Sequence, residues 1–172
     1  QQSDKSLPHT SRFSMGNEVA DLNNDLWTDI LTMDMLPRDE AIIKTSAGED
    51  SYEVYKFKLN FGYGKQVSRN TLQVNRGTID SGRVVFSDVA QAAGIEATDW
   101  SWCPLSVDFD GDGLKDIFIS NGIVRRPNDL DYINFISNDS IQEASQKSDF
   151  VLIDMMPEGK VSNFVFKNQG EF

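Results

Sequence analysis

The sequence predicts a mainly β fold made of two similar units, each the size of a β-propeller blade that carries a helical insertion. The first observation is an acidic segment, VADLNNDLWTDIL (19–31), that aligns with SVDFDGDGLKDIF (106–118). The second is a downstream match between RNTLQVNRG (69–77) and SNFVFKNQG (162–170). The two offsets are 87 and 93 residues. Repeats of this length are unusual for solenoids but fit propeller blades with insertions.

Short runs of β-forming residues provide the strands of each unit. The runs are DILTM (29–33), TLQV (71–74) and RVVFSDVA (83–90) in the first unit, and PLSV (104–107), DIFIS (116–120) and NFVF (163–166) in the second. An Asn-x-Gly turn is expected after the third strand of each unit, at Asn75–Gly77 and at Asn168–Gly170.

The alignment divides the chain into two predicted blades. The first spans 1–90 with an insertion at about 36–69, and the second spans 91–172 with an insertion at about 123–161. Two blades cannot close a propeller, which typically has about four to eight. The chain also begins with Gln-Gln rather than Met, as a processed product or a fragment would. We therefore expect a fragment of a longer propeller, completed by further blades or by a partner chain.

The insertions carry helix signals. Residues 50–60 predict a short helix with aromatic anchors, and residues 128–137 predict another that begins with Asn128 as its N-cap. Ser140 and Glu143 form a capping-box pattern that opens a third helix, through about residue 147.

Composition narrows the classes of partner. The 172 residues carry a formal net charge of −11, which argues against nucleic acid and favours cations or a solvated extracellular surface. No apolar run approaches the roughly 20 residues that a transmembrane helix needs. The single cysteine, Cys103, excludes an intrachain disulfide and lies in an apolar run where we expect it to be buried.

The second acidic loop has the spacing of a calcium site. Side-chain oxygens come from positions 1, 3, 5 and 9 of the loop, and the backbone carbonyl of position 7 is the natural fifth ligand. These ligands are Asp108, Asp110, Asp112, Asp116 and the carbonyl of Leu114. Without a cation, so many carboxylates in one tight loop would repel one another. The alternative is a solvated Asp/Gly turn without metal.

The first loop predicts a second calcium ion with a weaker ligand set. Its ligands would be Asp21, Asn23, Asp25, Asp29 and the carbonyl of Trp27. One carboxylate is replaced by an amide, and Leu26 stands where the second loop has Gly113, so any positive φ there is strained. A metal-free turn is again the alternative.

Neither loop fits an EF-hand. That motif needs a glutamate at position 12 and flanking helices. Position 12 is Thr32 in the first loop and Ile119 in the second, both within strand-like runs.

The pattern D-x-[DN]-x-D-x-x-x-D between short strands resembles the FG-GAP, or VCBS, repeat of integrin-α-like β-propellers. FSDVAQAAGI, DWSWCPLSVDFDGDGLKDIFISNG and FVFKNQGEF are similar to the blade consensus of bacterial VCBS proteins related to cartilage acidic protein. LPHTSRFSMGNEVADLNND and NGIVRRPNDLDYINF are similar to a Bacteroidota subgroup. The resemblance covers nearly the whole chain and implies calcium-stabilised blades on a secreted or outer-membrane-anchored protein.

Two other groups are candidate ligand-binding residues. Tyr52 and Tyr55, in an aromatic cluster with Phe57, Phe61 and Tyr63, would offer a stacking platform for sugars, or would pack the insertion onto the propeller. Arg125 and Arg126 would grip a carboxylate or phosphate, or would pair with the neighbouring Asp129 and Asp131.

Catalytic motifs are missing from the sequence, which has no G-x-S-x-G, no Cys/His pair and no phosphate loop. We therefore expect a binding or scaffolding module for a glycan or protein partner rather than an enzyme. Two alternatives remain open, a propeller-framed polysaccharide lyase or hydrolase and a purely structural subunit of an outer-membrane complex.

Overall fold

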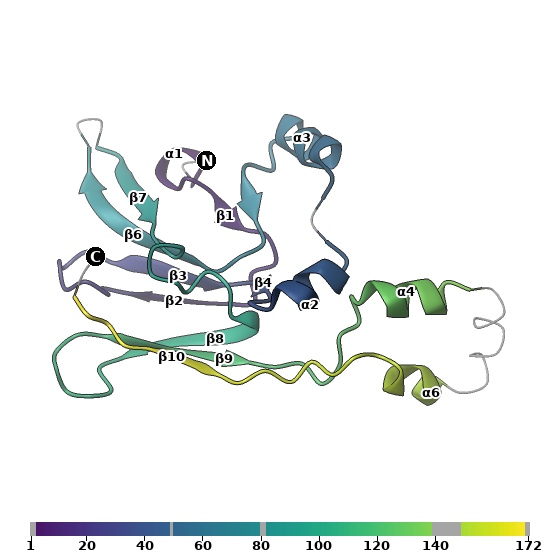
Figure 1. Cartoon of the computed structure of the whole chain (residues 1–172). Helices are drawn as coiled ribbons and strands as arrows, with labels where there is room; N and C mark the ends of the chain where they lie inside the picture. The colour runs from purple at the N-terminus through teal and green to yellow at the C-terminus, as the bar shows by residue number, and fades with distance from the viewer. Residues whose placement is uncertain (1–2, 49, 80–81, 139–148, 171–172) are drawn as a thin grey trace.

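The computed structural model describes residues 3–48, 50–79, 82–138 and 149–170. Within them the protein is mainly β, with three sheets and a few short helices (Figure 1). The first four-stranded sheet contains, in spatial order, β2 (Gly16–Ala20), β3 (Asp29–Met33), β6 (Thr71–Thr78) and β7 (Val84–Asp88). The second contains β10 (Phe164–Phe166), β9 (Asp116–Asn121), β8 (Asp99–Val107) and β4 (Met35–Leu36).

Neighbouring strands in both four-stranded sheets are antiparallel. A third, parallel pair joins β1 (Thr10–Ser11) to β5 (Gln66–Val67). The described helices are α1 (Ser3–Ser6), α2 (Glu40–Thr45), α3 (Tyr52–Asn60), α4 (Leu130–Ile136) and α6 (Asp149–Asp154).

The predicted strands are confirmed, and so is the helix expected at residues 50–60, which is α3. The helix expected at 128–137 is α4, but its N-cap is Asp129, whose carboxylate accepts a hydrogen bond from the Tyr132 amide at 2.9 Å. Asn128 as the cap was therefore wrong. The helix predicted from Ser140 and Glu143 lies outside the described residues.

The Asn-x-Gly motif of the first unit does not follow its strand as predicted, because β6 continues through it to Thr78. The pairing of β6 with β7 shifts register between Asn75 and Thr78, and Gly77 has a φ of 78°. The motif is an irregularity within a long strand, where glycine supplies the left-handed conformation.

The core lies between the two four-stranded sheets, which face each other as two layers (Figure 1). The first sheet buries Leu31, Met33, Leu72 and Val74, and the second contributes Ile117, Ile119, Phe164 and Phe166. When the two units are aligned, the residues that the first sheet buries and those that the second sheet buries fall on opposite faces of the blade. Ile117 corresponds to Ile30 rather than to Leu31, and Phe164 corresponds to Thr71 rather than to Leu72. One unit therefore presents its front to the back of the other.

The two ends of the layered sheets carry different elements. Both acidic loops lie at one end, where Lys115 donates to the Asp21 carbonyl at 2.7 Å and Asn24 donates to the Gly113 carbonyl at 3.0 Å. The helices α2 and α4 lie at the other end (Figure 1). There the insertions meet through a bridge between Ser46 and Asp129.

Candidate metal-binding site

The second acidic loop connects β8 to β9 and is folded around the carboxylate of Asp108. One carboxylate oxygen accepts from the amides of Gly111 and Asp112, at 2.7 and 3.1 Å, and the other accepts from Gly113 at 2.9 Å. Asp112 in turn accepts from the Leu114 amide at 2.9 Å. The carboxylates at positions 1 and 5 therefore shape the backbone of the loop.

The first loop, between β2 and β3, repeats this bonding. Asp21 accepts from the amides of Asp25 and Leu26, at 3.1 and 2.9 Å, and Asp25 accepts from the Trp27 amide at 2.8 Å. The position 3 side chain also accepts from the position 5 amide in both loops, at 3.2 Å for Asn23 and 3.3 Å for its counterpart Asp110. These four bonds therefore recur at aligned positions of the two loops, whereas the bond from the Gly111 amide belongs to the second loop.

The two loops also share their backbone conformation. Gly111 and Gly113 have φ values of 78° and 89°, and their counterparts Asn24 and Leu26 have φ values of 59° and 70°. A leucine in the left-handed region is strained by about 1–2 kcal/mol. The strain expected at Leu26 from the sequence is thus present, in a side chain that is 90% exposed.

The position 9 aspartates anchor both loops to the core. Asp29 is fully buried and accepts from the amides of Leu22 and Asn75, both at 2.9 Å. Asp116 accepts in the same way from Phe109 at 3.2 Å and Asn168 at 2.9 Å. Burial is the largest influence on Asp29 and raises the pKa of its carboxyl above the usual value.

Sequence reasoning found the Asn-x-Gly motifs but missed this role for their asparagines. Asn75 and Asn168 each accept from the amide two residues later, both at 2.9 Å, and present their own amides to the position 9 aspartate. The matched spacing of the two motifs behind the two acidic loops was the available signal.

Carboxylate oxygens of Asp108, Asp110 and Asp116 all lie within 4.8 Å of one another. Calcium–oxygen bonds are about 2.3–2.6 Å long, so ligand atoms on opposite sides of one ion are up to about 5 Å apart. The second loop therefore fits a calcium ion. Among the described residues, no other group of three acidic, His or Cys side chains meets the same test.

Lys167 is a feature of the second loop that sequence reasoning missed. Its ammonium group pairs with Asp110 and lies 3.3 Å from a carboxylate oxygen of Asp112. The hydrogen bond from Lys167 is the main reason why the pKa of Asp110 is lowered, and the same bond raises the pKa of Lys167. The loop thus already attracts one positive charge. The aligned residue in the first unit is Val74, which is buried in the core.

Position 7 differs between the loops in the side chain that it places on the following Asn-x-Gly motif. A Cβ atom at Gly77 would lie 2.0 Å from the Trp27 ring, so the indole lies directly on that glycine. A Cβ at Gly170 would be 3.5 Å from the Leu114 side chain. Only the first loop is therefore covered by an aromatic ring in close contact with the backbone.

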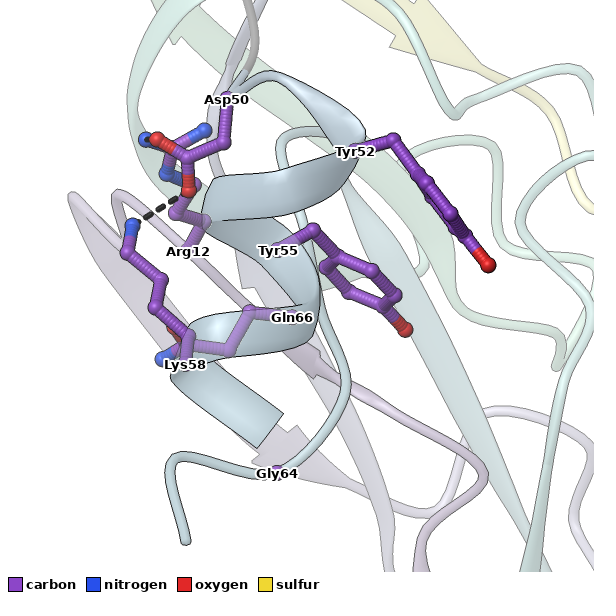
Figure 2. A pocket seen from close by; sticks show the side chains of 7 residues that line it. All are labelled: Arg12, Asp50, Tyr52, Tyr55, Lys58, Gly64 and Gln66. Carbon is purple, nitrogen blue, oxygen red and sulfur yellow. Dashed lines mark hydrogen bonds and ion pairs between the residues drawn. The ribbon is translucent and has the colours of Figure 1, made fainter. Parts of the chain in front are cut away.

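The predicted aromatic platform lies on α3, which Ser51 caps by accepting from the Val54 amide at 3.4 Å. Tyr52 and Tyr55 line a cavity of about 340 Å³ and project from the same side of the helix (Figure 2). Asp50 and Lys58 lie on the other side with Arg12, and both cations pair with the Asp50 carboxylate.

Four of the five aromatic residues are exposed rather than packed onto the sheets, whereas Tyr55 is half-buried. The exposed residues are Tyr52 at 66%, Phe57 at 61%, Phe61 at 66% and Tyr63 at 63%. Phe57 and Phe61 instead contact each other, with ring centroids 4.5 Å apart.

The two arginines have partners that the sequence did not predict. Arg126 is 4% exposed and donates to Asp99 at 2.8 Å, while Arg125 donates to the Met156 carbonyl at 3.2 Å and lies 3.5 Å from Asp154. The buried Arg126 is thus committed to fixing the second insertion against the start of β8, rather than to an exposed ligand.

Two further features were not anticipated. Cys103 is exposed, so its predicted burial was wrong; it lies on β8 just after an irregularity in the pairing with β9. His9 lies 2.9 Å from Asp88 and 3.0 Å from Arg69, and burial is the main cause that lowers its pKa below the usual value. This cluster attaches the N-terminal segment to the end of β7.

In the described ranges no helix has the length and apolar character needed to cross a membrane. Comparison of the chain with family models, with curated proteins and with solved structures found no match.

Proposed function

We propose that this chain is a calcium-stabilised pair of blades from an integrin-α-like β-propeller. It would act outside the cell or on the outer-membrane surface as a binding or scaffolding module for a glycan or protein partner. The observation that carries the proposal is the convergence of three carboxylates in the second loop, in a hydrogen-bonding frame that the first loop repeats. Asp108, Asp110 and Asp116 would hold one ion, with Asp112 and the Leu114 carbonyl completing the set. Asp21, Asn23, Asp25, Asp29 and the Trp27 carbonyl would hold a second.

The packing of the two sheets supports the propeller. In a propeller each blade places one face on the opposite face of the next, which is the front-to-back relation of the two units here. Repetition of the same step leaves the outer face of the second sheet for a further blade. That face carries exposed apolar residues, Leu105 at 45% and Val165 at 65%. In the alignment, Val165 corresponds to Leu72, which the second sheet buries completely.

Metal analysis tests the calcium assignment. After dialysis against micromolar calcium, we expect close to two ions per chain, and no metal or zinc alone would overturn the proposal. Chelation should lower the melting temperature, because an ion that binds only the folded chain stabilises it by about 2.7 kcal/mol per site at 100-fold excess over Kd. The matched control is the double variant Asp21→Asn with Asp108→Asn, whose melting should no longer respond to EDTA.

Binding of an apolar fluorescent dye tests the open sheet face. Val165→Lys should reduce dye binding more than Val124→Lys, a control position that is 77% exposed but lies outside the strands. Equal reductions would show that the outer face of the second sheet is not a distinct apolar surface, and would remove the argument for a further blade there.

A further inference from the structure

Hydrogen bonds join the two acidic loops directly to each other. Lys115, at position 8 of the second loop, is half-buried and donates to the carbonyl of Asp21 in the first loop at 2.7 Å. In the opposite direction, Asn24 at position 4 of the first loop donates to the carbonyl of Gly113 in the second loop at 3.0 Å. Each bond therefore starts on one loop and ends on the ligand-bearing backbone of the other.

Asn168 is buried and adds a third connection between the loops. Its side-chain amide donates to the carbonyls of Leu22 in the first loop and Lys115 in the second, at 2.9 and 3.2 Å. Its backbone amide donates to the carboxylate of Asp116, at position 9 of the second loop. One asparagine therefore contacts both loops and one of the predicted ligands.

The bonds from Asn24 and Lys115 are not part of the frame that the two loops share. The residue aligned with Asn24 is Gly111, which has no side chain, and the residue aligned with Lys115 is Thr28. Each loop therefore forms the shared frame without a counterpart of these groups. The two side chains serve the contact between the loops, and they can be replaced without removing a predicted ligand.

The connections end on parts of each loop that must be fixed before an ion can bind. Asn24 and Gly113 are two of the left-handed residues, with φ values of 59° and 89°. Asn24 also lies between the predicted ligands Asn23 and Asp25, so an ion in the first loop would hold it in place. When one loop is already held, the other has less conformational entropy to lose on taking up its own ion.

We propose that the two loops bind calcium cooperatively, each ion raising the affinity of the other loop about tenfold. Coupling between sites is typically about 5- to 150-fold, and it is reciprocal because both sites bias the same equilibrium. Repulsion between the two ions acts in the opposite direction, but salt at about 0.15 M screens exposed charges. The inference rests on the two calcium sites of the proposed function and names how these sites regulate each other.

Asp25→Asn weakens the first site without changing the residues that join the loops. Asparagine keeps the side-chain oxygen that accepts from the Trp27 amide, so the loop frame is preserved. The amide signal of Gly113 in a nitrogen-15 NMR spectrum reports the second loop. When calcium is titrated in about 0.15 M salt, this signal should give a dissociation constant about tenfold higher in Asp25→Asn than in the unchanged chain. The aligned change Asp112→Asn should raise the dissociation constant of the first loop by the same factor, read at the amide of Leu26.

A second pair of changes removes two of the connections themselves. Asn24→Gly and Lys115→Thr each introduce the residue of the aligned position, and glycine keeps the left-handed conformation. Of the three connections only that of Asn168 then remains. In this double variant, the addition of Asp25→Asn should raise the dissociation constant read at Gly113 by less than about threefold, because a double-mutant cycle isolates the coupling from the effect of each change alone.

The matched control makes the same two replacements at exposed positions outside the loops, as Asn60→Gly with Lys160→Thr. It removes the same charge from the chain and adds the same glycine freedom. In this control the tenfold effect of Asp25→Asn should persist. Melting curves of all variants check that they are folded.

Three results would overturn the cooperative binding proposed here. They are a Gly113 titration that is unchanged in Asp25→Asn, one that is tighter, which would show that repulsion between the ions dominates, and a tenfold effect that survives without Asn24 and Lys115. In each case the second loop still binds calcium, so the proposed function stands. A chain in which neither loop responds to calcium would overturn the proposed function and this inference together.

Discussion

The two acidic loops fold alike although their sequences differ at positions that a loop of this kind is expected to require. Both use the aspartates at positions 1, 5 and 9 to bind backbone amides, and both have left-handed residues at positions 4 and 6. At position 6 one loop has Gly113 and the other has Leu26. The carboxylates therefore determine the loop conformation, and glycine only lowers its cost.

The two loops differ in their charged side chains and in the side chain that packs on the Asn-x-Gly motif behind each loop. The second loop has Asp110 where the first has Asn23, and Lys167 lies against it. In the first unit the position aligned with Lys167 is the buried Val74, and the first loop has Trp27 packed on Gly77. The comparison suggests that the second loop depends more on a bound ion, while the first depends more on packing.

The largest difference is expected when Gly77 and Gly170, the glycines next to the position 7 side chains Trp27 and Leu114, are each replaced by alanine. Gly77 and Gly170 have φ values of 78° and 76°, so Gly77→Ala and Gly170→Ala carry the same backbone strain. Only Gly77→Ala also collides with the Trp27 ring, and overpacking typically costs about 1–3 kcal/mol. Urea denaturation should therefore show Gly77→Ala to be less stable than Gly170→Ala by about that amount. Equal losses would mean that Trp27 swings away freely and does not support its loop.

The next largest effect concerns position 3. Asp110→Asn gives the second loop the ligand set of the first, and Asn23→Asp does the reverse. Because ligand charge sets the affinity of oxygen sites for calcium, we expect the first change to weaken and the second to tighten binding, each by about tenfold, or about 1.4 kcal/mol. Calorimetric titration of both variants measures this exchange. An affinity that does not follow the substituted charge would show that loop geometry, rather than carboxylate count, ranks the two sites.

These loops also show how far the sequence could lead. The spacing of Asp108, Asp110 and Asp116 sufficed to predict oxygens that converge, because alternate residues of a tight loop point to one centre. Strands such as β3 and β9 were predictable from β-forming residues next to those loops. Both depend on neighbours in the sequence.

Other features could not be predicted because they depend on distant parts of the chain. Lys167 reaches Asp110 only once β10 pairs with β9, and Arg126 is buried only because Asp99 lies beside it. Cys103 lies in an apolar run, yet it is exposed on a sheet face that no other described element covers. Burial in an apolar run requires a second layer, which the local sequence does not reveal.

Because the backbone at Leu26 is strained, its replacement by glycine should stabilise the chain, whereas most substitutions destabilise a protein. The expected effect is smaller than the two above. Leu26→Gly removes a left-handed conformation that costs about 1–2 kcal/mol, and the side chain buries little surface that could be lost. The added freedom of glycine in the unfolded chain offsets about 0.5–1 kcal/mol of this. We expect a net stabilisation of roughly 0.5–1 kcal/mol by chemical denaturation. The matched change Gly113→Leu should destabilise the chain, and stabilisation in both cases would contradict the argument.

The smallest effect is expected at Lys167. Its ammonium group occupies two of the carboxylates that would hold an ion in the second loop, so the cation and the lysine compete for the same oxygens. Exposed ion pairs contribute little to stability, because water screens them. Lys167→Met should therefore tighten calcium binding at the second loop by only about two- to fivefold.

Lys160→Met removes a lysine that is 4.0 Å from Glu158 and has no contact with the loop, so it controls for the change in net charge. If both variants tighten binding equally, the effect belongs to the overall charge of −11 becoming more negative and not to competition at Asp110 and Asp112. If only Lys167→Met does so, the asymmetry between the loops includes a built-in competitor that the first loop, with Val74 at the aligned position, does not have.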